Sequence, residues 1–127
     1  DYSRVHLPGQ VGYDTLIDIL SLSSAHVYFT YPFVLSWSLL DAMACEALIV
    51  ASDTAPVRDV IRHNENGLMV DFFDVDGLSR ALIEACREPA QFQPLRKAAR
   101  ETVVSGYDRA AINLPAWLAL IDEVAAS

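Results

Sequence analysis

Short apolar runs alternate along the chain with helix-length amphipathic segments, and Gly, Pro and Asn residues separate them. Residues 47–52 form a continuous apolar run, which is typical of a strand covered on both faces of a parallel sheet. The predicted strands are 4–7, 25–30, 47–52 and 68–70. The predicted helices are 13–23, 36–44, 57–63, 74–86, 89–106 and 108–126, and Pro115 should kink or restart the last one. This alternation predicts an α/β fold with a parallel sheet of about four strands and flanking helices.

In open parallel sheets, ligands bind beyond the carboxyl ends of the strands, here residues 30–36, 52–57 and 71–76. Ser36 is a predicted N-cap, so the backbone N–H groups of Leu35, Ser36 and Trp37 stand at the start of a helix. Such groups can bind an anion, and a nucleotide pyrophosphate would suit them. Because no glycine-rich loop precedes them, an ordinary capped helix start is the alternative interpretation.

Two aspartates are candidates for ligand contact. Asp41 is a lone carboxylate among apolar neighbours in the second turn of the helix 36–44. It either reaches solvent or faces a cleft, where it could accept hydrogen bonds from vicinal hydroxyls such as those of a ribose. Asp53 follows an apolar strand at its carboxyl end, a position that suits either ligand contact or a local turn.

The amino-acid composition restricts the classes of molecule that the chain is expected to bind. The chain has 127 residues, with 9 Lys and Arg against 17 Asp and Glu, so a net charge of −8 argues against nucleic acid and anionic lipid. The apolar stretches are too short to span a membrane, and no signal peptide is evident, which favours a soluble, cytoplasmic protein. Cys45 and Cys86 are expected to be buried free thiols. The three histidines lack companions at ligand spacing, so we expect no metal and no cofactor.

A longer pattern carries a family resemblance. Ser-Leu-Leu-Asp-Ala-Met-Ala-Cys-Glu-Ala-Leu-Ile-Val-Ala-Ser-Asp, then Arg-Asp-Val-Ile, then Asn-Glu-Asn-Gly-Leu-Met-Val, resembles the carboxyl-terminal donor-binding domain of retaining family-four glycosyltransferases with the GT-B fold. Coverage runs from about Val5 to Cys86 and more loosely to the end. The resemblance implies a Rossmann-like sheet and one incomplete, group 1-like donor-binding domain over residues 1–127. It also implies sugar transfer from a UDP- or GDP-linked donor, with retention and without an obligatory metal.

The resemblance also implies roles for individual residues. The family's second motif glutamate, expected to hold the ribose hydroxyls, maps onto Asp41, while the first, expected to contact the donor sugar, maps onto Phe33. The catalytic residue is therefore unknown. Residues 34–36 replace the family's usual Gly-Phe-Gly but keep the backbone amides that would bind the pyrophosphate. Glu46 stands where a glycine usually ends the helix. Residues 55–56 stand where the family commonly has two glycines.

The resemblance implies that the family's domain opens with two further strand–helix units, whose Arg and Lys neutralise the diphosphate, and follows a whole acceptor-binding domain. The 127 residues contain neither, so the chain is expected to be a part of a longer enzyme or a truncated relative. We therefore expect no transferase turnover by this chain alone. Exposed sheet edges predict a homo-oligomer, most simply a dimer closed by strands or by the helix bearing Trp117. The alternative function is a non-catalytic oligomeric α/β module, which Phe33 favours. A phospho-acceptor domain using Asp53 lacks the required acidic pair and lysine.

Overall fold

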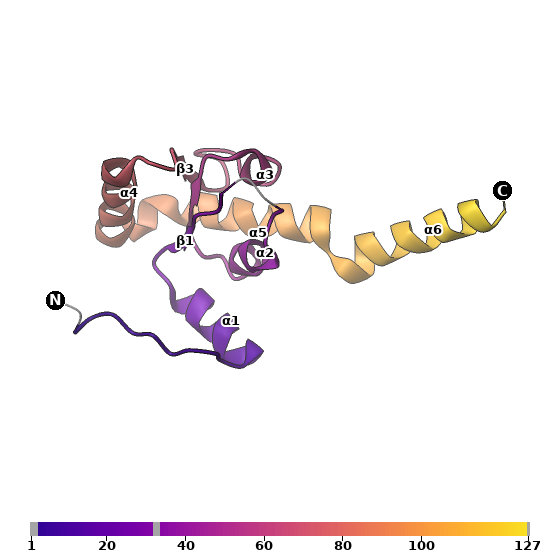
Figure 1. Ribbon diagram of the computed structural model, residues 1–127, viewed down its shortest axis with the longest axis horizontal. Coiled ribbons are helices and arrows are strands. Elements are labelled where there is room, and N and C mark those ends of the chain that lie inside the picture. Colours follow the sequence, from indigo (N-terminus) through magenta and orange to yellow (C-terminus); the bar gives the residue numbers. More distant parts are fainter. Residues whose placement is uncertain (1–2, 32–33, 127) are drawn as a thin grey trace.

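The computed structural model describes residues 3–31 and 34–126, which alternate helices with short strands (Figure 1). The strands are β1 (His26–Tyr28), β2 (Ile49–Ser52) and β3 (Leu68–Val70). The α-helices are α1 (Tyr13–Leu22), α2 (Trp37–Ala44), α3 (Ala55–Arg58), α4 (Val75–Arg87), α5 (Gln93–Tyr107) and α6 (Leu114–Ala125). A 3-10 helix, η1 (Pro89–Phe92), precedes α5, and a π-helical turn, η2 (Arg109–Asn113), precedes α6.

All strand pairs are parallel and the sheet order is β1-β2-β3, which confirms the α/β class. His26 pairs with Ile49, and Val50 pairs with Leu68. The predicted strand 4–7 is wrong: these residues run as a turn and irregular chain, and Leu7 is 90% exposed. A strand needs a neighbour to accept its backbone hydrogen bonds, and the sheet offers none there. The described residues therefore form three strands rather than four.

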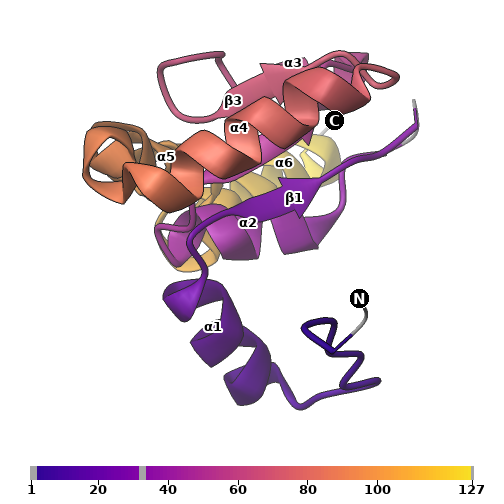
Figure 2. The same ribbon diagram turned by 90° about the vertical axis from the view of Figure 1, so that its left-hand side faces the viewer.

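The central strand β2 is buried on both faces, as its apolar run predicts. Because side chains alternate along a strand, Ile49 and Ala51 join one core cluster with residues of α2 and α5, while Val50 joins a second cluster with α4 and Phe92. Figure 2 shows α2 and α4 on opposite sides of β1. The result is a three-layer helix–sheet–helix arrangement with its core around β2.

Local capping explains where the helices begin. The predicted N-cap Ser36 accepts a hydrogen bond from the Ser38 backbone N–H, at 3.3 Å. Asp74 caps α4 by accepting a hydrogen bond from the Gly77 backbone N–H, at 2.8 Å. The predicted helix 57–63 is shorter and earlier, because Pro56 sits in the first turn of α3 and the chain turns away after Arg58.

The carboxyl-terminal part of the chain restarts near Pro115, as predicted. That proline lies in the first turn of α6, after the π-helical turn that Asp108 caps. Figure 1 shows α6 projecting away from the sheet, and α6 has no buried residue. Both cysteines are free, but Cys45 is only half-buried and Cys86 is exposed, so the prediction of buried thiols is wrong. Within residues 3–31 and 34–126, no helix is long and apolar enough to cross a membrane.

Candidate functional site

The start of α2 is the first predicted ligand contact. The Ser36 backbone N–H is already used, because it donates to the Tyr28 hydroxyl at 2.8 Å. The Ser36 side chain is also engaged, with its hydroxyl 2.9 Å from that of Ser38. Among the described residues, the backbone N–H groups of Leu35 and Trp37 meet no acceptor. Of the three predicted anion-binding amides, two therefore remain available. Phe33 lies outside the described residues.

Asp41 lies one turn further along α2 and is half-buried. Its Oδ1 accepts a hydrogen bond from the Tyr13 hydroxyl at 3.1 Å, which connects α2 to the first residue of α1. The hydrogen bond to this carboxylate, together with its negative charge, raises the pKa of Tyr13 above its ordinary value. Tyr13 was missed by sequence reasoning, since no local pattern connects positions 28 residues apart.

A cavity of about 620 Å³ lies beside Asp41, between α2 and the α5–α6 junction. Its lining is mainly apolar, with Asp41, Arg109 and Asn113 as polar groups. The apolar side chains on it are Trp37, Leu40, Ala44, Val103, Tyr107, Leu114 and Trp117. Asp41 thus lines this cleft and is half-buried, and its role in binding a ribose stays a prediction.

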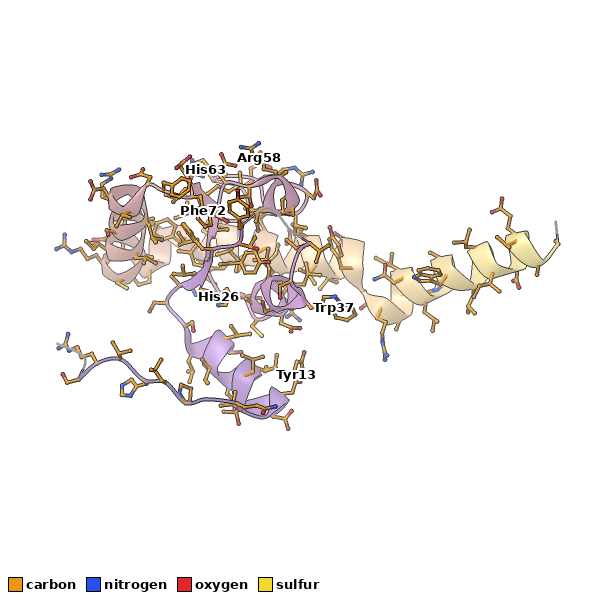
Figure 3. All side chains as sticks on the ribbon, viewed as in Figure 1. Tyr13, His26, Trp37, Arg58, His63 and Phe72 are labelled. Atoms are coloured by element: carbon orange, nitrogen blue, oxygen red, sulfur yellow. The ribbon has the colours of Figure 1, made fainter. Side chains whose placement is uncertain are left out.

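Asp53 is held at the carboxyl end of β2 by other partners. Its Oδ1 accepts a hydrogen bond from Arg58 Nε at 2.6 Å, and this bond lowers the pKa of the Asp53 carboxyl below its ordinary value. Its backbone N–H donates to the Val70 carbonyl at 2.8 Å. In Figure 3, Arg58 and Tyr13 lie on opposite sides of α2. The structure therefore does not bring Asp53 together with Asp41.

Four aromatic residues gather where β1 and β3 end, a feature that the sequence pattern did not reveal. Phe72 is the centre, with ring centroids 5.9 Å from Phe29, 6.0 Å from Tyr31 and 5.1 Å from Phe73. Nearby, the Ser52 hydroxyl connects β2 to Thr30. It accepts a hydrogen bond from the Thr30 backbone N–H and donates one to the Thr30 carbonyl, both at 3.1 Å. These contacts give the carboxyl edge of the sheet a fixed, largely aromatic surface beside the start of α2.

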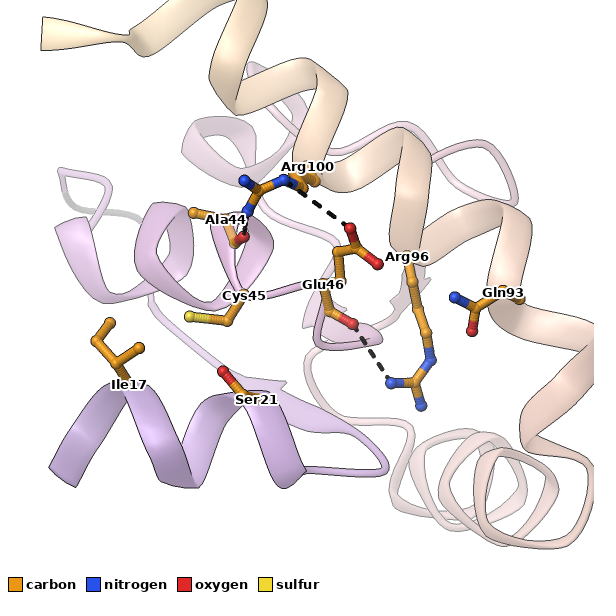
Figure 4. A pocket seen from close by; sticks show the side chains of 8 residues that line it. All are labelled: Ile17, Ser21, Ala44, Cys45, Glu46, Gln93, Arg96 and Arg100. Atoms are coloured by element: carbon orange, nitrogen blue, oxygen red, sulfur yellow. Dashed lines mark hydrogen bonds and ion pairs between the residues drawn. The ribbon is translucent and has the colours of Figure 1, made fainter. Parts of the chain in front are cut away.

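Two arginines lie at the opposite end of α2, beside a cavity of about 440 Å³ (Figure 4). Arg96 donates to the carbonyls of Ser23, Ser24 and Glu46, and Arg100 donates to the carbonyl of Ala44. These guanidinium groups satisfy carbonyls at the end of a helix and in two turns, so their role is structural. Across residues 3–31 and 34–126, no three His, Cys, Asp or Glu side chains gather as a metal site would require.

Comparison with known proteins decides the family. A family model described as glycosyl transferases group 1 matches residues 3–102. The chain belongs to the glycosyl transferases group 1 family. This membership confirms the resemblance at the level of a GT-B glycosyltransferase fragment.

Solved glycosyltransferase structures agree with this fold. Sucrose-phosphate synthase from Thermosynechococcus elongatus is 28% identical, with a TM-score of 0.79 over 94% of this chain. The structure named TarM is 23% identical, with a TM-score of 0.57 over 67% of this chain, and supports the fold alone. No curated protein sequence matches significantly. This group 1 fragment spans about 30% of the synthase and 17% of TarM.

Proposed function

We propose that this chain is the donor-binding portion of a glycosyltransferase that transfers a sugar from a UDP- or GDP-linked donor with retention of configuration. The observation that carries the proposal is the family match over residues 3–102, which includes α2 with Asp41 lining a cleft. In this proposal the Asp41 carboxylate accepts hydrogen bonds from the ribose hydroxyls of the donor. A full-length enzyme would supply the acceptor site.

The geometry around Asp41 supports a hydroxyl-binding role. The Tyr13 hydroxyl bonds Oδ1 of Asp41, so the side chain is oriented from the α1 side while the second carboxylate oxygen has no protein partner among the described residues. A carboxylate offers about four acceptor sites, so one protein hydrogen bond leaves capacity for the two hydroxyls of a ribose. Tyr13 is thus a positioning residue for the ribose acceptor.

The pyrophosphate is proposed to lie at the start of α2, on the N–H groups of Leu35 and Trp37. The positive end of the helix dipole and unpaired N–H groups both favour an anion there. The cation nearest in sequence to the carboxyl edge, Arg58, is paired with Asp53. Transfer of the sugar develops negative charge on the leaving diphosphate, and fixed positive charge must stabilise it. The proposal therefore includes nucleotide binding without turnover by the 127-residue chain.

Calorimetric titration with UDP, GDP and their glucose and mannose conjugates tests the proposal. We expect Asp41→Asn to weaken nucleotide binding at least about tenfold, because a charged hydrogen-bond acceptor is lost. Tyr13→Phe should weaken binding less, since it keeps the carboxylate. Asp122→Asn, on the exposed end of α6, is the control with the same chemical change and should bind like the parent chain. Asp53→Asn tests the second predicted contact.

The outcomes are distinct. Equal binding by the parent chain and Asp41→Asn would overturn the assignment of Asp41 while keeping a nucleotide site. Absence of binding to every nucleotide at millimolar concentration would overturn the donor-binding proposal for this chain. Sugar release from a donor above the buffer rate would contradict the expected absence of turnover.

A non-catalytic oligomeric α/β module is the second candidate function. One observation favours it: the Ser36 N–H, at the centre of the predicted pyrophosphate contact, donates to Tyr28 instead of standing free. This module would show no nucleotide affinity and would still self-associate. The same titration therefore separates the two candidates.

A further inference from the structure

A histidine side chain covers the outer edge of strand β3. Within residues 3–31 and 34–126, β3 pairs with β2 alone, so its other side is an edge of the sheet. The Val70 carbonyl accepts the Asp53 N–H at 2.8 Å and therefore faces β2. Because the backbone groups of successive strand residues face opposite sides, the Met69 N–H points outward. There the His63 ring meets it, and Nδ1 accepts the Met69 N–H at 2.9 Å.

This hydrogen bond requires a neutral imidazole that carries its proton on Nε2. A protonated imidazole has an N–H at both ring nitrogens and no acceptor. Protonation of His63 would therefore set an Nδ1–H against the Met69 N–H and break the bond. Imidazole is the side chain that ordinarily changes its charge between about pH 5 and pH 8. The contact that covers the edge of β3 is thus one that acid can remove.

The surroundings of His63 offer partners for an imidazolium. The ring is exposed and lines a cavity of about 420 Å³ between the outer side of β3 and α4. Arginine side chains already pair with two of the nearby carboxylates, since Arg58 contacts Asp53 and Arg80 contacts Asp74. The charged groups that face or flank His63 are Asp53, Arg58, Arg62, Glu65, Asp71, Asp74, Arg80 and Glu84. Acidic groups outnumber basic ones in this set, so a ring released from Met69 would find a carboxylate within reach.

The outer edge of β3 is connected to the carboxyl edge of the sheet. Strand β3 has only three residues, so each of its backbone hydrogen bonds is a large share of what holds it. Met69 precedes Val70, whose carbonyl holds the Asp53 N–H. Phe72, the centre of the aromatic cluster, follows two residues later. Loss of the contact at Met69 should therefore loosen the end of β3 and, with it, the hydrogen bond to Asp53.

We propose that His63 makes the outer edge of β3 sensitive to pH. The neutral ring holds the Met69 N–H near pH 7.5, and the protonated ring releases it near pH 5.5. The release loosens the hydrogen bond between Asp53 and Val70 at the carboxyl edge of the sheet. This local opening does not depend on the proposed function, because it involves proton binding by the free chain and no nucleotide.

Backbone amide exchange of the 127-residue chain at pH 7.5 and pH 5.5, followed by NMR, tests the proposal. Rates are first corrected for the intrinsic effect of pH on amide exchange. The protection of the Met69 N–H should then fall at least about tenfold at the lower pH, because its acceptor is lost. The Asp53 N–H should lose protection in parallel but by less. The Ala51 N–H, in the buried central strand, should keep its protection.

Two substitutions at the same position separate the acceptor from the titration. His63→Asn keeps an oxygen acceptor near the place of Nδ1 but binds no proton in this range, so Met69 should stay protected at both pH values. His63→Phe keeps a ring without an acceptor, so Met69 should be unprotected at both. His6→Asn, in the exposed segment before α1, is the matched control and should keep the pH dependence of the parent.

Each contrary result has a definite meaning. Equal protection of Met69 at the two pH values in the parent chain would overturn the proposal. So would a pH dependence that His63→Asn leaves unchanged, because another group would then be titrating. A loss of protection at Ala51 as large as that at Met69 would replace local opening by unfolding of the whole sheet. Loss at Met69 without any change at Asp53 would overturn the connection to the carboxyl edge.

Discussion

Strand β2 and helix α6 are both strongly apolar, yet they have opposite fates in the fold. Every residue of β2 is buried, whereas no residue of α6 is. Helices cover β2 on both faces, from α2 and α5 on one side and α4 on the other. Helix α6 follows the π-helical turn and projects away from the body, and each of its residues is exposed (Figure 1).

This contrast shows that the apolar composition of a segment favours its burial but does not determine which element packs against it. For β2 the neighbours come from near and far in the sequence, because α2 leads directly into the strand while α5 packs against it from residues 93–107. For α6, no element within residues 3–31 and 34–126 buries any of its residues. An apolar strand inside a sheet is thus buried by the elements on either face, whereas the apolar side chains of α6 stay exposed in the described residues.

Two matched substitutions should give the largest difference between these regions. Ile49→Ala in β2 removes a fully buried side chain and should lower the free energy of unfolding by about 2–5 kcal/mol. Ile121→Ala in α6 removes the same atoms from a site that is 57% exposed, and should change it by less than about 0.5 kcal/mol in dilute solution. Urea unfolding followed by circular dichroism measures both, and equal losses would refute the contrast.

The arginine at the edge of the core should give the next largest effect. Arg96→Met keeps an aliphatic chain but removes the donors to the carbonyls of Ser23, Ser24 and Glu46, so we expect a loss of about 2 kcal/mol. Lys97→Met, at the exposed neighbouring position, is the control and should lie within about 0.5 kcal/mol of the parent. Amide exchange should quicken in the turn before β1 only in Arg96→Met.

How far the sequence predicted the fold depended on whether the deciding contacts were local. The apolar run before Ser52 and the cap at Ser36 are local signals, and the structure contains both features. The strand expected at residues 4–7 has the right residue types but no neighbouring strand, which local composition does not encode. Arg96 contacts a carbonyl 73 residues away, a distance at which periodicity carries no information.

In the candidate site, too, local signals were predictable from the sequence and long-range contacts were not. Asp41 stands out in sequence because a carboxylate interrupts an apolar helix, and the structure places it on a cleft. The two tyrosines that shape the site were not predictable, since Tyr28 reaches Ser36 and Tyr13 reaches Asp41 only through folding. The aromatic cluster around Phe72 also joins two strand ends that are distant in sequence.

A smaller effect is expected where α2 ends. Glu46 has a left-handed backbone, with φ of 56°. The Glu46 N–H donates to the Met43 carbonyl and the Ala47 N–H donates to the Ala42 carbonyl, and these two hydrogen bonds end the helix. Glu46→Gly should therefore raise the free energy of unfolding by about 1 kcal/mol, because glycine adopts this conformation without strain. Glu46→Ala also removes the exposed pairing with Arg100 but keeps the strain, so it should not stabilise. Equal stabilities of the two variants would contradict the role of backbone strain.

The smallest expected effect concerns pH, at the sheet edge where the core meets solvent. Burial lowers the pKa of His26 below its ordinary value of 6.5, so the folded chain binds a proton less readily than the unfolded chain. The unfolded state then holds more protons as the pH falls below about 6.5, and stability decreases there. His26→Gln should flatten this decrease in urea unfolding between about pH 7 and pH 5, because the titrating group is removed. His6→Gln, in the exposed segment before α1, should keep the parent slope. An unchanged slope in His26→Gln would show that other groups set the pH dependence, and that even the edge strand of the sheet is open enough to solvate a charged imidazole.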